Sequence, residues 1–463
     1  MFGILNKFRL TVFGDEVFPI LINIRKYRKM SQFLLKSQFW SKDEIIENQT
    51  NRLKKLIEHC NENVPYYKKK FCKINIKPKD MKDISNLQNL PFLTKQDIKD
   101  NTNSFRARNY QGHKFENIST GGTTGTPLKF FVEKDIWYVN DMAFNSNAIY
   151  QIASSIKGKY VFLRHHLIRS SKKENFWKYT IFGRWLLLSS YHLSEKNMQR
   201  YIELIRKFKP KFFIGYPSSI SLLASFMNNN SIESFNGIEL VICGGENLYD
   251  WQNHLIKKKF NCNILNIYGH AERTLFAATC SKSNFHHFYP QYGILELINK
   301  EGNCVSKEGE IGEIVGTGFY NNIFPFIRYR TGDLGVLTIK KCSCGRNYPM
   351  LKKIQGRKQE FVVSKNGSLL PLSGIFGLVG RNSNNILFSQ FYQELQGELI
   401  LKINKGHKYT DLDEKRIKKA FFNRYTNEID LVLDYVSGIP QTNNGRHNFL
   451  IQKLHIDFYN KIL

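Results

Sequence analysis

The sequence has no long apolar run. Its two most apolar stretches, residues 18–22 and 185–188, are far shorter than the roughly 20 residues that a membrane-spanning helix needs. A transmembrane protein is therefore not expected. A secretory signal is also not expected, because Asp15 and Glu16 interrupt the apolar residues near the N-terminus and no small-residue cleavage site follows them. We expect a cytoplasmic protein, with at most peripheral contact at the inner face of the membrane.

Cysteine and acidic residues are both scarce. Eight scattered cysteines in 463 residues exclude a secreted disulfide scaffold and fit a reducing compartment. The 39 acidic residues face 68 Lys and Arg, which gives a net charge of +29 that attracts polyanions. Because the basic residues are spread along the whole chain, we favour a solvated basic surface over a specific nucleic-acid site. The basic amphipathic segment 23–36 predicts an ordinary surface helix, and membrane-surface docking is the less favoured alternative.

Apolar residues are plentiful enough to build a core, at 42% of the chain. Residues 17–75 read as helical, with a second helix over 44–61 that is broken at Val64-Pro65. From about residue 117 to 354, short apolar runs alternate with amphipathic stretches, a pattern typical of a largely parallel sheet covered by helices. The predicted strands lie at residues 160–163, 212–214, 240–242 and 264–267, and the predicted helices at 196–207 and 218–227.

The later part of the chain changes character. Residues 312–339 read as strands and turns without helices, and a shorter αβ segment follows Gly356-Arg357. We therefore predict an α/β protein with a large N-terminal domain over 1–354, whose parallel or mixed sheets are layered by helices. A small α+β domain is expected over 355–463. Ligand sites in such sheets lie at the carboxyl ends of the strands, which is where the Gly-rich segments fall.

The most specific motif is a Gly/Thr run between Ser119 and Pro127. Its three glycines allow a tight backbone path with exposed amide groups, and its threonines add hydroxyl donors. Both kinds of donor suit phosphate oxygens. The run lacks the lysine of the common phosphate-binding loop, and taken alone it fits a flexible turn equally well.

Four further motifs follow in order along the chain. They are Cys243-Gly244-Gly245-Glu246, Tyr268-Gly269-His270-Ala271-Glu272, Tyr329-Arg330-Thr331-Gly332-Asp333 and Gly356-Arg357. With these motifs in this order, the chain resembles the adenylate-forming, acyl-CoA synthetase-like superfamily. Within it, the chain is most similar to the group of phenylacetate–CoA ligases, coenzyme F390 synthetases and CapK proteins of capsule biosynthesis. The resemblance covers nearly the whole chain.

This resemblance implies a large N-terminal domain, a small mobile C-terminal domain, and a reaction of ATP and Mg²⁺ with a carboxylic acid. The product is an acyl-adenylate, commonly passed on to CoA or another acceptor. The residues that the family pattern assigns to the β- and γ-phosphates are Thr120, Gly121, Gly122, Thr123, Thr124, Gly125 and Thr126. Those assigned to the adenine pocket are Gly244, Gly245, Glu246, Tyr268 and Gly269.

Four more residues take roles from the same resemblance. Glu272 matches the acidic residue that supports Mg²⁺, and a carboxylate oxygen is what this hard cation prefers. Asp333 matches the carboxylate that binds the ribose hydroxyls, and Arg357 matches a residue that contacts ribose and phosphate. Arg446 stands at the position of the usual catalytic lysine, so Thr124, Glu272 and Arg446 are the expected catalytic residues.

Arg446 is also the main departure from the family pattern. Arginine keeps the charge but replaces a compact ammonium with a planar fork, which is not a neutral exchange in a crowded site. The hinge also differs, since Gln359 or Glu360 stands where an Asp is common. We therefore keep as the alternative a catalytically weak or inactive family member that binds a nucleotide or a polyanion.

A second group of residues has the composition of a metal site. Cys342 and Cys344, together with Cys280 and one of His286 and His287, can supply the four ligands of a tetrahedral Zn²⁺. Scattered buried thiols are the competing interpretation. Members of the resembled group carry cysteines and a histidine in similar places, which favours a structural zinc. Its ligands are then Cys280, His287, Cys342 and Cys344, with His287 preferred for its family-like spacing to Glu296.

The acid and its acceptor are not specified by the sequence. CoA, a carrier thiol, and an amine or hydroxyl group of a sugar all stay open as acceptors. The resemblance to CapK favours a role in surface polysaccharide biosynthesis. A monomer and a homodimer both remain open.

Overall fold

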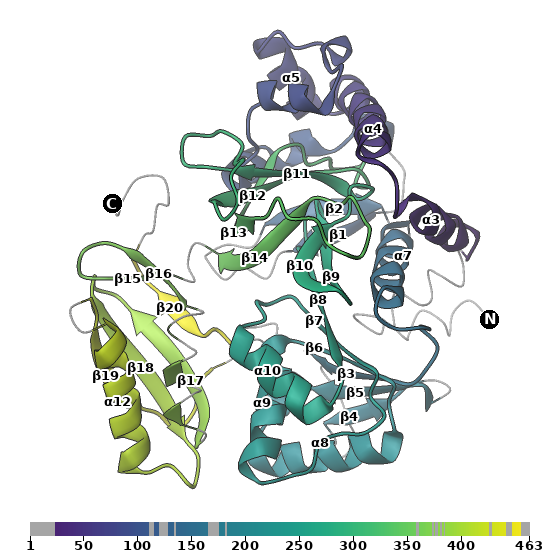
Figure 1. Cartoon of the computed structure of the whole chain (residues 1–463). Helices are drawn as coiled ribbons and strands as arrows, with labels where there is room; N and C mark the ends of the chain where they lie inside the picture. Colours follow the sequence, from purple (N-terminus) through teal and green to yellow (C-terminus); the bar gives the residue numbers. More distant parts are fainter. Residues whose placement is uncertain are drawn as a thin grey trace.

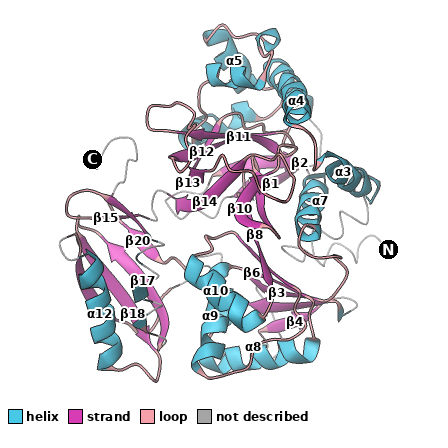
Figure 2. Cartoon of the chain, viewed as in Figure 1, coloured by secondary structure: helices cyan, strands magenta, loops and turns pink. Residues whose placement is uncertain are grey.

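A computed structural model of the chain describes residues 24–110, 115–119, 128–133, 136–164, 176–180, 183–357, 361–372, 375, 378–379, 382–383, 385–425, 428–440 and 447–454. The fold is mixed α/β, as predicted, and is built around one large sheet (Figures 1 and 2). Among the described residues, none of the helices combines the length and the apolar character needed to cross a bilayer.

One half of the large sheet is parallel and confirms the predicted strands. Its order is β5 (Trp185–Ser189), β3 (Tyr160–Arg164), β6 (Phe212–Gly215), β7 (Leu240–Gly244) and β8 (Asn263–Gly269), with β4 (Trp177–Tyr179) antiparallel at the edge. Alternate side chains along β3 face opposite layers. Val161 and Leu163 pack under α8 (Glu195–Phe208), α9 (Pro217–Asn229) and α10 (Asp250–Phe260). Phe162 packs on the other side, with α7 (Ile136–Tyr150).

The other half of the sheet is antiparallel, so the expectation of a largely parallel sheet is correct for only half of it. The strands are β9 (Phe276–Cys280), β10 (Ser283–Phe288), β11 (Gly293–Ile298), β12 (Ile311–Gly318), β13 (Tyr329–Leu337) and β14 (Met350–Arg357). Short connections without crossover helices join them, and such connections produce antiparallel pairs. β14 lies between β13 and β10, and β9 joins this half to β8.

The first described part of the chain is helical, as expected for residues 17–75. It forms α3 (Ile24–Ser37), α4 (Lys42–Asn63) and α5 (Pro65–Lys73), followed by α6 (Lys95–Asn101). Ser41 caps α4 through a capping box with Glu44, and Pro65 both ends α4 and opens α5 at a position where its missing N–H costs nothing. In α3, the Tyr27 hydroxyl donates to Ser146 Oγ of α7 at 3.0 Å while the basic side chains stay exposed, which agrees with a surface helix.

The chain after β14 forms separate, smaller sheets. β15 (Phe361–Val363) pairs with β16 (Leu369–Pro371), and the other sheet has the order β19 (Asp430–Tyr435), β18 (Glu398–Lys405), β17 (Ile386–Gln393) and β20 (Leu450–Gln452). α12 (Asp411–Tyr425) buries Ile417 and Phe421 against them. This part lies beside α9 and α10 (Figure 1). The proposed domain boundary at residue 354 stays a prediction.

We expect His447 to make the stability of the small sheet depend on pH. Its side chain is buried beside the Phe388 ring, and burial lowers the pKa of His447 to about 4. An unfolded histidine binds its proton near pH 6.5, so the unfolded state binds more protons and stability falls as the pH drops from about 6.5 to about 4. We expect hydrogen exchange of β17 peptides in moderate urea to be faster at pH 5 than at pH 7, after correction for intrinsic rates. His447→Phe should reduce this difference, and an unchanged difference would exclude His447 as its source.

Candidate active site

The turn after β8 carries the candidate magnesium ligand. The Glu272 side chain is almost fully buried, and its Oε1 accepts a hydrogen bond from the Tyr329 hydroxyl at 2.7 Å. Its Oε2 lies 3.3 Å from His270 Nδ1, and the other ring nitrogen of His270 lies 3.1 Å from Thr274 Oγ1. Both carboxylate oxygens of Glu272 are therefore fixed by neighbouring side chains.

The surroundings of Glu272 keep it ionised. Burial raises the pKa of Glu272. The hydrogen bond and charge of His270 and the hydrogen bond from Tyr329 outweigh this effect, and the pKa is lowered to about 2. A buried carboxylate that is negative at neutral pH is a suitable oxygen ligand for a hard divalent cation.

Tyr268 and Asp333 are brought together from distant strands. The Tyr268 hydroxyl donates to Asp333 Oδ2 at 2.8 Å. Tyr268 lies in β8 and Asp333 in β13, with β9, β10 and β14 between these two strands in the sheet. Strands stand about 4.8 Å apart, so a flat sheet would hold the two residues roughly 19 Å from each other. The sheet must therefore bend sharply, and the bend creates the site.

The other residues assigned to the nucleotide lie close by in the fold. Asp333 stands opposite Arg357 in the β13–β14 register, so the two residues assigned to the ribose are backbone neighbours. Gly244 ends β7, and Gly245 has a φ of +82°, which glycine adopts without strain. Glu246 Oε2 accepts a hydrogen bond from the Ser218 N–H at the start of α9, 3.0 Å away.

Three groups of residues singled out in the sequence lie outside the described residues. They are the phosphate-binding assignments from Thr120 to Thr126, the hinge residues Gln359 and Glu360, and the catalytic assignment of Arg446. The strands that flank the first group, β1 (Phe115–Ser119) and β2 (Lys129–Glu133), pair antiparallel with Ser119 opposite Lys129.

Sequence reasoning missed two residues that contact Glu272. His270 and Tyr329 both hold its carboxylate, yet neither was assigned a role. Both stand inside recognised motifs: His270 lies two residues before Glu272, and Tyr329 lies four residues before Asp333. Their polar side chains at motif positions were the available signal.

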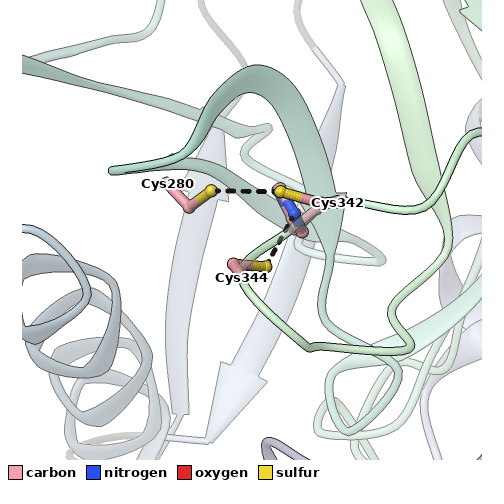
Figure 3. Close-up of side chains that lie close together, drawn as sticks. Cys280, Cys342 and Cys344 are labelled. Carbon is pink, nitrogen blue, oxygen red and sulfur yellow. Dashed lines mark hydrogen bonds between the residues drawn. The ribbon is translucent and has the colours of Figure 1, made fainter.

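The four predicted metal ligands gather at one place in the antiparallel half. Cys280 ends β9, His287 lies in β10, and Cys342 and Cys344 lie in the connection between β13 and β14. Their ligand atoms all lie within 4.8 Å of one another, and the labelled cysteines converge in Figure 3. Cys280 Sγ lies 3.7 Å from Cys342 Sγ, and Cys344 Sγ lies 3.4 Å from His287 Nε2. The group contains His287 and not His286, which is separately buried.

The thiols of this cluster differ in their protonation. Burial raises the pKa of Cys280 and of Cys342, but hydrogen bonds outweigh burial and lower both pKa values. The largest of these hydrogen bonds comes from the Lys282 N–H for Cys280 and from the Ser283 hydroxyl for Cys342. Burial raises the pKa of Cys344. The thiolate form, which binds metals, is therefore easier to reach for Cys280 and Cys342 than for Cys344.

Similarity to known proteins covers most of the chain. A family model described as the CapK C-terminal domain matches residues 362–453. Protein CapK of Staphylococcus aureus is 26% identical over 89% of this chain and 90% of its own length. The phenylacetate-coenzyme A ligase of Pseudomonas putida is 27% identical over 72% of this chain and 74% of its own length.

A solved structure has the same fold. It is 2-hydroxyisobutyryl-CoA ligase in the postadenylation state in complex with 2-HIB-AMP, with a TM-score of 0.73 and 16% identity over 90% of this chain and 91% of that one. The sequence relatives and this shared fold agree with the ordered motifs around Glu272 and Asp333. Over most of its length the chain is therefore similar to CapK and the phenylacetate–CoA ligases, and it has the fold of a solved adenylate-forming CoA ligase.

Proposed function

We propose that this AMP-forming ligase uses ATP and Mg²⁺ to convert a small carboxylic acid into an acyl-adenylate and transfers the acyl group to CoA or another acceptor. The observation that carries the proposal is the buried, ionised Glu272 carboxylate in the turn after β8, four residues after Tyr268, whose hydroxyl donates to Asp333. The relatives named as phenylacetate-coenzyme A ligases support CoA as the first acceptor to test.

The reaction depends on positioning rather than on a covalent bond to the protein. A carboxylate oxygen of the acid attacks the α-phosphorus of ATP as the bond to the leaving pyrophosphate breaks, which requires the two to be held in line. Mg²⁺ supplies positive charge where negative charge develops. In this chain Glu272 would hold the cation and Asp333 the ribose. Residues 120–126, Arg357 and Arg446 would face the phosphates.

Exchange of radiolabelled pyrophosphate into ATP tests the first half-reaction. A panel of aryl, acyl and amino acids should include one that supports Mg²⁺-dependent exchange. Addition of CoA, or of sugar amines and alcohols, then identifies the acceptor by the thioester, amide or ester formed. A chain that supports no exchange with any acid but binds polyanions tightly in a salt-sensitive way would instead be a binding protein.

We also propose that Cys280, His287, Cys342 and Cys344 hold a structural Zn²⁺. The donor set fits this ion, because three sulfurs and one imidazole nitrogen form a common closed zinc site. The spacing fits as well. Two sulfurs bound tetrahedrally at about 2.3 Å from zinc lie about 3.8 Å apart, and Cys280 Sγ and Cys342 Sγ are 3.7 Å apart. Bound zinc would join the β9–β10 hairpin to the β13–β14 connection.

Asp333→Asn should mainly weaken ATP binding. The change removes the negative charge that would accept the ribose hydroxyls, and hydrogen bonds to charged groups contribute about 1.5–3 kcal/mol. We expect the KM for ATP in the exchange assay to rise at least about 10-fold. Asp434→Asn, at an exposed position of β19, is the matched control. An unchanged KM for ATP would remove Asp333 from the nucleotide site.

A further inference from the structure

The residue directly after Glu272 has an unusual backbone. Arg273 has a φ of +50°, in the left-handed region that side chains other than glycine rarely adopt. Its N–H donates to the His270 carbonyl at 3.0 Å, which closes the turn that carries Glu272. A conformation of this kind persists only where the surrounding structure holds it, and such positions cluster at functional sites.

The Arg273 side chain is anchored to helix α7. Arg273 Nη1 lies 2.8 Å from Asp141 Oδ2, and the two side chains are only 21% and 17% exposed. The other carboxylate oxygen, Asp141 Oδ1, accepts a hydrogen bond from the Tyr292 hydroxyl at 3.0 Å. Because the pair is largely shielded from water, its attraction is stronger than that of a surface pair, and losing one partner leaves the other poorly compensated.

Helix α7 provides a rigid base for this anchor. Phe144, one turn after Asp141, is fully buried and packs edge-on against Tyr292, with ring centroids 4.8 Å apart. Tyr292 therefore contacts both the ion pair and the core under α7. The β8–β9 turn thus contacts other elements at two points: Tyr329 of β13 binds Glu272, and Asp141 of α7 binds Arg273.

We propose that the Asp141–Arg273 ion pair is a positioning device for the Glu272 carboxylate, and that it sets how tightly the protein binds Mg²⁺–ATP. This inference rests on the proposed function, because it takes Glu272 as the residue that supports Mg²⁺. Asp141 and Arg273 are positioning residues, since they act through the orientation of Glu272. Partners that orient a metal-supporting carboxylate typically contribute 10–100-fold to metal affinity or activity, and we expect an effect of about that size.

Two variants separate the ion pair from the backbone. Asp141→Asn removes the charge while keeping the shape of the side chain. Arg273→Gly removes the side chain while allowing the same positive φ without strain. Calorimetric titration of each variant with Mg²⁺–ATP should show binding at least about 10-fold weaker than that of the wild-type protein, at a thermal stability that still leaves the chain folded. Glu239→Gln breaks the Lys211–Glu239 pair, which is also part-buried at 31% and 33%, and should leave the affinity unchanged.

A double variant decides whether the pair acts through Glu272. In a Glu272→Gln background, Asp141→Asn should weaken Mg²⁺–ATP binding little further, because residues that act as a unit are not additive. Fully additive losses, or single variants with wild-type affinity, would overturn the inference. Wild-type protein that binds no Mg²⁺–ATP would instead overturn the proposed function, and the titration needs no knowledge of the acid.

Discussion

Replacing Glu272 by glutamine is expected to lower the rate of ATP–pyrophosphate exchange at least about 100-fold. Glutamine keeps the size and one oxygen of the side chain but removes the negative charge that would support Mg²⁺. It also changes the partner of His270 and of the Tyr329 hydroxyl, both of which contact this carboxylate. The loss should appear mainly as a higher Mg²⁺ requirement and a lower maximal rate.

The pH dependence sharpens this expectation. The pKa of Glu272 is lowered to about 2, so its carboxylate stays ionised throughout the pH range of an exchange assay. The ratio of wild-type to Glu272→Gln rates should therefore be constant between about pH 6 and 9. Glu239→Gln, which precedes β7 at the end of the strand opposite to Gly244, serves as the control for loss of one carboxylate charge. Exchange in Glu272→Gln at the wild-type rate would contradict the assignment of Glu272.

Loss of the proposed zinc should lower the thermal stability of the protein, which is the second-largest effect that we expect. We expect the purified protein to contain one equivalent of zinc, measured by mass spectrometry of the metal under reducing conditions. Cys342→Ser should remove it, because the hydroxyl is a poor replacement for the thiolate. The loss of a metal that joins three separate segments should cost several kcal/mol, which corresponds to about 5–10 °C in the melting temperature.

A matched cysteine provides the control for this experiment. Cys72 is exposed and lies in α5, apart from the cluster, so Cys72→Ser should retain both zinc and the wild-type melting temperature. Treatment of the wild-type protein with a chelator should reproduce the melting temperature of Cys342→Ser. Absence of zinc from freshly purified wild-type protein would rule out the site.

Local patterns in the sequence located four strands and two helices of the parallel half, but not β4, β5, α7 or α10. Each predicted strand from Tyr160 to Ile267 lies within an observed strand, because buried parallel strands are short continuous apolar runs. In the antiparallel half, only residues 312–339, which hold β12 and β13, were predicted as strands and turns. This half is joined to β8 by the pairing of β9 with β8. The alternation of apolar residues along a strand does not determine which other strand it pairs with.

The candidate site was also predicted only in part. Glu272 and Asp333 could be identified because each stands inside a motif that resembles one of the adenylate-forming superfamily. The contacts that fix them come from residues far away in the sequence: Tyr329 reaches Glu272 across 57 positions, and Asp141 reaches Arg273 from a helix with no motif. Such contacts depend on the bend of the sheet, and no local pattern encodes that bend. The zinc ligands were recognisable because thiols and imidazoles are chemically distinctive wherever they stand.

The position of β14 has a consequence for how the chain is made on the ribosome. β14 is the last strand of the large sheet to be synthesised, yet it lies between β13 and β10. Until it emerges, β10 and β13 each keep an unpaired edge, and open edges of this kind are prone to pairing with other chains. The nascent chain therefore passes through a period in which its sheet has a gap, which β14 closes from the inside. The same strand carries Arg357 opposite Asp333, so closing the gap also brings together the two residues assigned to the ribose.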